Sequence, residues 1–171
     1  MPAWSSSEAE TRSLGGRIAE ALHRSGRRPV LVSLKGDLGA GKSALARGIL
    51  SRWLALTDGV KDPPVMPSPT YTIALVYGAH APAAHLDLYR LKSLEELEQA
   101  GGIHYFHEQS LCLVEWLDQI PGARELVPED ALEIEVRGVG EERREIRGRF
   151  ITNPVAVLEE TLKHEVGELF L

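Results

Sequence analysis

The sequence predicts an α/β fold in a single domain, and three observations lead to this prediction. Short apolar runs typical of buried strands recur along the chain and alternate with segments of helical periodicity. A glycine-rich stretch, residues 36–43, lies between the first of these strands and the helix that follows it. Near the C-terminus, residues 131–150 alternate apolar and charged side chains across a glycine-containing turn, which is the pattern of a β-hairpin.

Length and composition limit the classes of protein to consider. The 171 residues suffice for one domain with a sizeable core, and the apolar fraction of 43% is ordinary for a globular protein. The net charge of −6 argues against a protein that binds DNA or another nucleic acid by itself, because that function needs a basic face. A single cysteine leaves no internal disulfide, and no apolar run approaches the roughly 18 residues of a membrane span. We therefore expect a cytoplasmic protein with no membrane partner.

The N-terminal third is expected to hold a helix, a strand and a second helix. A Ser5-x-x-Glu8 capping box precedes the first helix, whose apolar stripe runs through residues 14–22. Residues 30–34 are a β-branched apolar run and predict a buried, parallel strand. The second helix is expected over residues 42–56, where apolar side chains recur at helical spacing.

The remaining elements follow from breakers, caps and alternation. They are a proline-rich loop (57–70), two strands (71–77 and 83–89), a capped helix (93–101), a buried strand (111–115), the hairpin (131–138 and 143–150) and a last helix with Asn153 as its N-cap and Pro154 as its first residue. We expect residues 1–152 to form the main domain and residues 153–171 a C-terminal helical extension.

The glycine-rich stretch reads "GDLGAGKS" and fits the G-x-x-x-x-G-K-[ST] pattern of a phosphate-binding loop, or P-loop. Successive backbone N–H groups in such a loop form an anion-binding concavity, and the N-terminus of the following helix adds partial positive charge. Lys42 supplies a cation for the β- and γ-phosphates, and the hydroxyl of Ser43 suits Mg²⁺. The residues predicted to bind the nucleotide are Gly36, Asp37, Leu38, Gly39, Ala40, Gly41, Lys42, Ser43 and Ala44.

An acidic partner for the loop is expected at the end of a neighbouring buried strand. Glu115 ends the apolar run 111–114, and we interpret it as the acid on the Mg²⁺ side, acting directly or through water. An aspartate is usual at this place, so the longer side chain is a departure. The alternative is a strand-end carboxylate exposed to solvent. Trp116 follows directly and is expected in the core, with the nucleotide pocket or a partner surface as its alternatives.

Two further polar residues are candidates for work on the γ-phosphate. Asp87 lies between two leucines, so strand alternation places it on the face opposite to theirs. It either orients the attacking water or belongs to the solvated face of an edge strand. Thr70 ends the proline-rich loop, where its hydroxyl either reaches a γ-phosphate, as switch segments do, or caps the next strand.

Four stretches taken in order resemble one known family. They are "GDLGAGKS", "SPTYT" at residues 68–72, "HLDLYRL" at residues 85–91 and "LVEW" at residues 113–116. With the N-terminal helix they cover residues 7 to about 120, and the chain is similar to the bacterial TsaE (YjeE) ATPases. The combination is far more specific than the P-loop alone, because few P-loop proteins carry both an SPT segment and HxDLYR.

The resemblance implies a P-loop NTPase fold with a mixed, largely parallel sheet flanked by helices. It implies a slow ATPase, using ATP and Mg²⁺, that works with the TsaB and TsaD proteins to form N6-threonylcarbamoyladenosine at position 37 of tRNAs, so that tRNA is reached only through the complex. In that reading Ser43 and Glu115 hold Mg²⁺, Thr70 senses the γ-phosphate, and Lys42 and Asp87 support hydrolysis. Ala44 departs from the family, which often has a second hydroxyl there.

Two other functions fit the same loop. A small-molecule kinase shares it, but no arginine-rich lid insert is visible between the strands. A nucleotide-gated binding protein, in which occupancy matters and turnover does not, needs no further residues.

Overall fold

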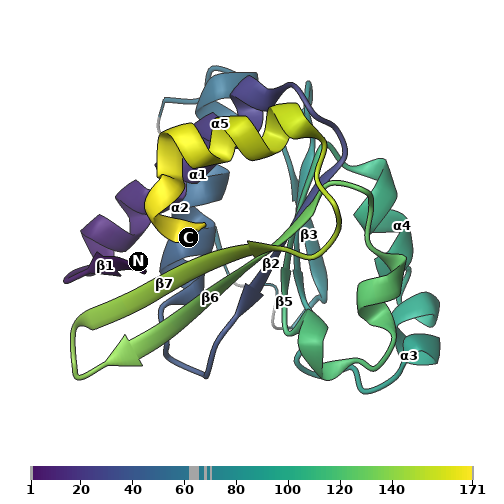
Figure 1. Ribbon diagram of the computed structural model, residues 1–171. Helices are drawn as coiled ribbons and strands as arrows, with labels where there is room; N and C mark the ends of the chain where they lie inside the picture. The colour runs from purple at the N-terminus through teal and green to yellow at the C-terminus, as the bar shows by residue number, and fades with distance from the viewer. Residues whose placement is uncertain (1, 62–65, 68, 70, 171) are drawn as a thin grey trace.

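The computed structural model describes residues 2–61, 66–67, 69 and 71–170, and it forms a seven-stranded sheet with helices on both faces (Figure 1). The strands are β1 (Ala3–Ser5), β2 (Val30–Lys35), β3 (Ala74–Tyr77), β4 (Ala83–Asp87), β5 (Leu111–Glu115), β6 (Ala131–Val139) and β7 (Arg143–Phe150). The α-helices are α1 (Glu8–Ser25), α2 (Lys42–Thr57), α3 (Leu94–Gln99), α4 (Gly102–Glu108) and α5 (Ala156–Val166), and the 3₁₀ turns are η1 (Leu117–Gln119), η2 (Ala123–Leu126) and η3 (Gly167–Leu169).

The strand order across the sheet is β1-β7-β6-β2-β5-β4-β3. The three pairs β6–β2, β2–β5 and β5–β4 are parallel, and they form the centre of the sheet. The outer pairs β1–β7, β7–β6 and β4–β3 are antiparallel. The mixed, largely parallel sheet and the C-terminal hairpin predicted from the sequence are therefore confirmed.

The start of the chain differs from the prediction. Ser5 does not cap the first helix, because it belongs to the short edge strand β1 and pairs with Arg144 of β7. The capping box lies two residues later: the Ser7 hydroxyl accepts a hydrogen bond from the Glu10 N–H (3.1 Å), and the Glu10 carboxylate accepts one from the Ser6 N–H (2.6 Å). The sequence holds three consecutive serines, so the pattern alone left the register of the cap open.

Helices α1 and α2 cross at very short distance on one face of the sheet. A Cβ atom added to Gly15 would lie 2.6 Å from the Leu45 carbonyl oxygen, and one added to Gly48 would lie 2.2 Å from the Arg12 carbonyl oxygen. Side chains at either glycine would force the helices apart. This contact places the N-terminal turn of α1 beside the N-terminal turn of α2, which is where the glycine-rich loop ends.

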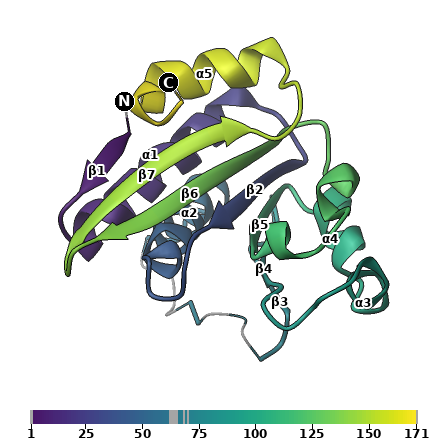
Figure 2. The same ribbon diagram turned by 60° about the horizontal axis from the view of Figure 1, so that its bottom comes forward.

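The opposite face of the sheet is covered by α3 and α4 (Figure 2). Leu97 from α3 and Phe106 from α4 are fully buried there, together with Leu31, Cys112 and Val114 from the sheet. The predicted helix at residues 93–101 is confirmed as α3, with the Ser93 hydroxyl accepting from the Glu96 N–H. The short helix α4 was not predicted.

Helix α5 packs on α1, and its apolar stripe joins the core cluster of α1 and α2. The helix begins at Ala156, later than the predicted start at Asn153 and Pro154. The Thr152 hydroxyl accepts from the Ala131 N–H (3.2 Å), and the Asp130 carboxylate accepts from the N–H of the residue before α5 (3.4 Å). These contacts tie the segment to the start of β6, and the N-cap Val155 is extended, so the helix begins only at Ala156. None of the helices in the described part of the chain is long and apolar enough to cross a membrane.

Candidate nucleotide-binding site

The carboxyl ends of three neighbouring parallel strands meet at one edge of the sheet. The glycine-rich loop leaves β2 at this edge, Glu115 ends β5 and Asp87 ends β4. Leu34 of β2 and Asp87 of β4 are both register partners of Glu115, on its two sides. Ligands of open α/β sheets bind outside the carboxyl ends of the strands, so the topology places the candidate site here.

The loop backbone takes conformations that only glycine tolerates. Gly36 has φ +145°, and a Cβ atom there would lie 2.2 Å from the Val136 carbonyl oxygen of β6. Gly41, with φ +108°, is the N-cap of α2 and has no side chain to cap the helix. The first turn of α2 therefore keeps N–H groups free of a side-chain cap, which suits the binding of an anion.

Lys42 lies across the loop and is only 5% exposed. Its ammonium donates hydrogen bonds to the carbonyl oxygens of Gly36 (2.7 Å) and Asp37 (2.9 Å), and it lies 4.3 Å from the centre of the Trp116 ring. Burial lowers the pKa of Lys42, and the nearby carboxylates, Glu115 foremost, oppose this shift. An ammonium carries three N–H donors, so one remains for a phosphate oxygen beyond the two carbonyl contacts.

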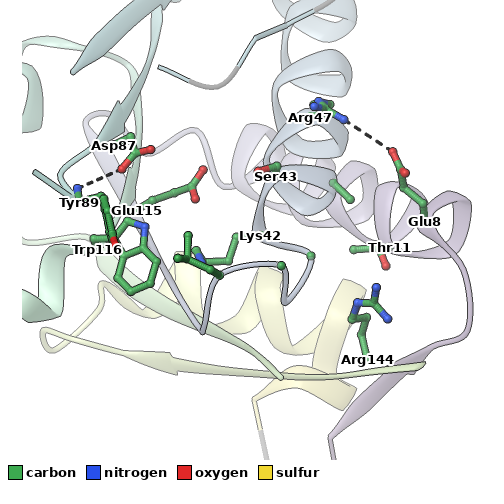
Figure 3. Close-up of a pocket in the computed structure, with 14 residues that line it drawn as sticks. Glu8, Thr11, Lys42, Ser43, Arg47, Asp87, Tyr89, Glu115, Trp116 and Arg144 are labelled. Atoms are coloured by element: carbon green, nitrogen blue, oxygen red, sulfur yellow. Dashed lines mark hydrogen bonds and ion pairs between the residues drawn. The ribbon is translucent and has the colours of Figure 1, made fainter. Parts of the chain in front are cut away.

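A cavity of about 420 Å³ opens over the loop (Figure 3). Its lining brings together most of the residues predicted from the sequence: Leu38, Gly39, Gly41, Lys42, Ser43, Ala44, Asp87 and Glu115. Gly36, Asp37 and Ala40 do not line it: the first two hold Lys42 through their carbonyls, and Ala40 is buried beneath the loop. Thr70 lies outside the described residues.

Both acids at this edge are buried, so neither is a solvent-exposed strand end. Glu115 is 4% exposed, and its Oε1 lies 2.9 Å from Nε2 of His85, which is buried as well. Asp87 accepts a hydrogen bond at Oδ1 from the Tyr89 N–H (3.0 Å) and is 8% exposed. Its strand is flanked by β3 and β5, so β4 is not the edge strand of the alternative interpretation.

Comparison with known proteins identifies the family to which a chain with this site belongs. The sequence model of the family described as threonylcarbamoyl adenosine biosynthesis protein TsaE matches residues 5–146. The chain belongs to the TsaE family. It is 34% identical over 137 residues to the tRNA threonylcarbamoyladenosine biosynthesis protein TsaE of Bacillus subtilis, a match that covers 79% of each chain. It is 36% identical over 146 residues to the TsaE protein of Streptomyces coelicolor, covering 82% of this chain and 88% of that one.

The fold agrees with this membership. The crystal structure of Bacillus subtilis YdiB superimposes with a TM-score of 0.64 and 27% identity, covering 96% of this chain and 95% of that chain. Both the P-loop NTPase fold and a family role in tRNA threonylcarbamoyladenosine biosynthesis are therefore established for the chain. The TsaE match includes every residue that lines the cavity, from Glu8 to Arg144, and stops before α5.

The TsaE cavity also contains Trp116, for which the nucleotide pocket was an alternative interpretation, and four residues that the sequence did not point to. Trp116 was expected in the core, but its backbone is left-handed (φ +66°) and its ring contacts Lys42 and, at 5.2 Å between ring centres, Tyr89. On the other side of the loop the lining is Glu8, Thr11, Arg47 and Arg144. These residues come from α1, α2 and β7, so no single motif contains them. His85 falls inside the "HLDLYRL" stretch, and its spacing of two from Asp87 was the available signal that both face the same way.

Proposed function

We propose that this TsaE protein binds ATP with Mg²⁺ and hydrolyses it as the ATPase component of a complex with TsaB and TsaD, which forms N6-threonylcarbamoyladenosine at position 37 of tRNAs. Brisk turnover by the isolated chain is not expected, because the two arginines in the described lining of the cavity, Arg47 and Arg144, lie on the other side of the loop from Asp87 and Glu115 (Figure 3). tRNA is then reached through the partners rather than by this chain alone.

One observation above all supports the proposal. Asp87 and Glu115 are register partners at the ends of adjacent strands, and both line the cavity over the P-loop that holds Lys42. The three side chains interact electrostatically, since both carboxylates favour the charged form of Lys42. One acid on the Mg²⁺ side and a second that can orient water suit phosphoryl transfer to water, whereas binding alone does not require the second acid.

The donor set fits Mg²⁺ rather than a transition metal. Mg²⁺ takes hard oxygen ligands, keeps several waters and usually binds one or two carboxylates together with substrate phosphates. Ser43 and Glu115 offer a hydroxyl and a carboxylate to the same cavity. Among the described residues no group of three or more His, Cys, Asp or Glu side chains is placed to hold a metal by itself. The chemistry supplied by a bound Mg²⁺ is neutralisation of charge on the β- and γ-phosphate oxygens.

Each protein group then has one role. Lys42 and the N–H groups of the loop stabilise negative charge on the transferred phosphoryl group. Asp87 orients the attacking water, and its carboxylate is itself oriented by the Tyr89 N–H. Thr70 remains the proposed sensor of the γ-phosphate.

The proposal is tested by measuring ATP turnover alone and with purified TsaB and TsaD, and tRNA modification by the same mixtures. Lys42→Ala should weaken nucleotide binding at least tenfold, whereas Lys163→Ala, an exposed residue paired with Glu159 on α5, serves as the control. Asp87→Asn should lower turnover by about a hundredfold or more with much smaller loss of binding. If Asp87→Asn abolishes turnover and leaves tRNA modification intact, the protein is a nucleotide-gated partner, and hydrolysis is not its function.

A further inference from the structure

Strand β7 carries four arginines, and alternation sorts them onto two faces. Arg144 shares its face with Ile146, which is fully buried against the α1 and α2 side of the sheet. Arg143 and Arg147 belong to the opposite face. The neighbours of Arg144 in the sheet are Ser5 of the edge strand β1 and Gly138 of β6, so it stands one strand in from the edge, at the end of the sheet that adjoins the P-loop.

The side chain of Arg144 lies against the loop backbone and lines the nucleotide cavity (Figure 3). A Cβ atom built on Gly41 would lie 3.1 Å from Nε and 3.4 Å from Cδ of Arg144. The absence of a side chain at Gly41 thus leaves space for the guanidinium. It also permits the positive φ that the loop requires at this residue.

The charge of Arg144 is not matched by an acid. Its guanidinium makes only long hydrogen bonds, to the carbonyl oxygens of Glu141 (3.4 Å) and Arg143 (3.3 Å), and no ion pair with any described residue. Two of the other arginines of β7 have acidic partners, Arg147 with Glu145 and Arg149 with Glu133. Arg143 also has no ion pair with a described residue, but its guanidinium lies over the Trp4 ring at 4.1 Å. Arg144 therefore presents an uncompensated cation to a cavity proposed to hold a polyanion.

The position of Arg144 along the cavity indicates which part of a nucleotide it meets. Lys42, which reaches the β- and γ-phosphates in P-loops, points toward Trp116 and the two acids at one side of the loop. Arg144 stands at the other side, with Thr11 and Glu8, and Ser43 lies between the two groups (Figure 3). In a bound nucleotide, the α-phosphate and the ribose lie on the side of the cavity away from the γ-phosphate.

We propose that Arg144 is a nucleotide-binding residue that holds the α-phosphate end of a nucleoside di- or triphosphate, and that the C-terminal hairpin is thereby part of the nucleotide site. This inference rests on the proposed function, because it assumes a nucleotide in the P-loop. A guanidinium presents a planar fork of N–H donors that matches phosphate oxygens. The contact would be the same for ADP and ATP, since both carry the α-phosphate.

The test is a titration of ADP and of a non-hydrolysable ATP analogue into four proteins: the wild type, Arg144→Ala, Arg144→Gln and Arg143→Ala. Loss of a charge-assisted hydrogen bond should raise the Kd of both nucleotides about tenfold in the two Arg144 variants, with the ratio of the two Kd values unchanged. Arg143→Ala removes the neighbouring charge from the other face and should leave both Kd values within twofold. Arg144→Gln removes the charge but keeps the aliphatic part of the side chain and a polar end, and it stands in if Arg144→Ala does not fold.

Each outcome is decisive. Unchanged Kd values in the Arg144 variants would overturn the inference while the wild type still binds. A loss confined to the ATP analogue would overturn it too, because it would place Arg144 at the γ-phosphate. Equal losses in Arg143→Ala would show a general charge effect and no specific contact. Failure of the wild type to bind either nucleotide would instead refute the proposed function itself.

Discussion

The hydrogen bond between His85 and Glu115 leads to the most exacting prediction. Both side chains are buried, and the Nε2–Oε1 distance is 2.9 Å. We predict that His85→Ala lowers the free energy of unfolding by about 3 kcal/mol, because it strands a buried carboxylate without its donor. Nδ1 of His85 is buried and has no hydrogen-bond partner among the described residues, so the hydrogen bond that the substitution removes is the one at Nε2.

The electrostatic part of this loss in free energy of unfolding can be isolated by making the same substitution in a Glu115→Gln variant. In Glu115→Gln the acceptor is neutral, and deleting the histidine should then cost about 1 kcal/mol, the value of an ordinary hydrogen bond. The difference of about 2 kcal/mol is the coupling energy between the imidazole and the carboxylate. Neighbouring side chains are the same in both backgrounds, so the space left by the ring cancels in the comparison.

The assay is urea denaturation of the four proteins of this double-mutant cycle. A functional readout accompanies it: if His85 positions Glu115 for Mg²⁺, His85→Ala should reduce the dependence of ADP affinity on Mg²⁺, and His85→Gln, whose amide can still donate, should restore part of it. Equal losses of stability in both backgrounds would refute the coupling. Unaltered Mg²⁺ dependence in His85→Ala would refute the positioning role.

The other predictions concern packing, reactivity and pH. Gly36→Ala should destabilise the protein by more than about 2 kcal/mol in the same denaturation assay, because its Cβ would overlap a carbonyl oxygen of β6, whereas Gly140→Ala, with positive φ and open space, should cost less. Burial raises the pKa of the Cys112 thiol, so a thiol reagent should react at the rate of unfolding and not faster; rapid labelling of the native protein would contradict this. Hydrogen bonds from the backbone and ring of His80 lower the pKa of Asp58, so its contribution to stability should be complete above the ordinary pKa of about 4 and be lost as the pH falls below it. Asp58→Asn should remove that part of the acid dependence of unfolding, and an unchanged pH profile would contradict the assignment.

Much of the site was predictable because local rules determine it. The loop needs glycine at Gly36 and Gly41 for backbone reasons, and its lysine follows directly in the chain. The positions of Asp87 and Glu115 at strand ends followed from alternation and from the apolar runs before them. That they are register partners depends on strand pairing, which the sequence does not encode locally.

The features that escaped prediction depend on distant contacts. Strand β1 has only three residues and is formed by pairing with β7, so no pattern in residues 3–5 predicts it. Trp116 lines the cavity, which was an alternative to its expected place in the core, and its backbone is left-handed after the strand. The sequence pattern did not distinguish Arg144 from the other charged residues of the hairpin, and the burial of Ile146 on the same face shows which way Arg144 points.

The pairing of β1 with β7 has a consequence for synthesis on the ribosome. Ala3 finds its partner only when Ile146 has left the exit tunnel, almost the entire chain later. The strand β2 before the loop pairs with β5 and β6, which are made earlier than β7, whereas Thr11 and Arg144 can face one another only once the hairpin is complete. Truncated products released before that point would carry the phosphate-binding loop without the wall that closes it on this side.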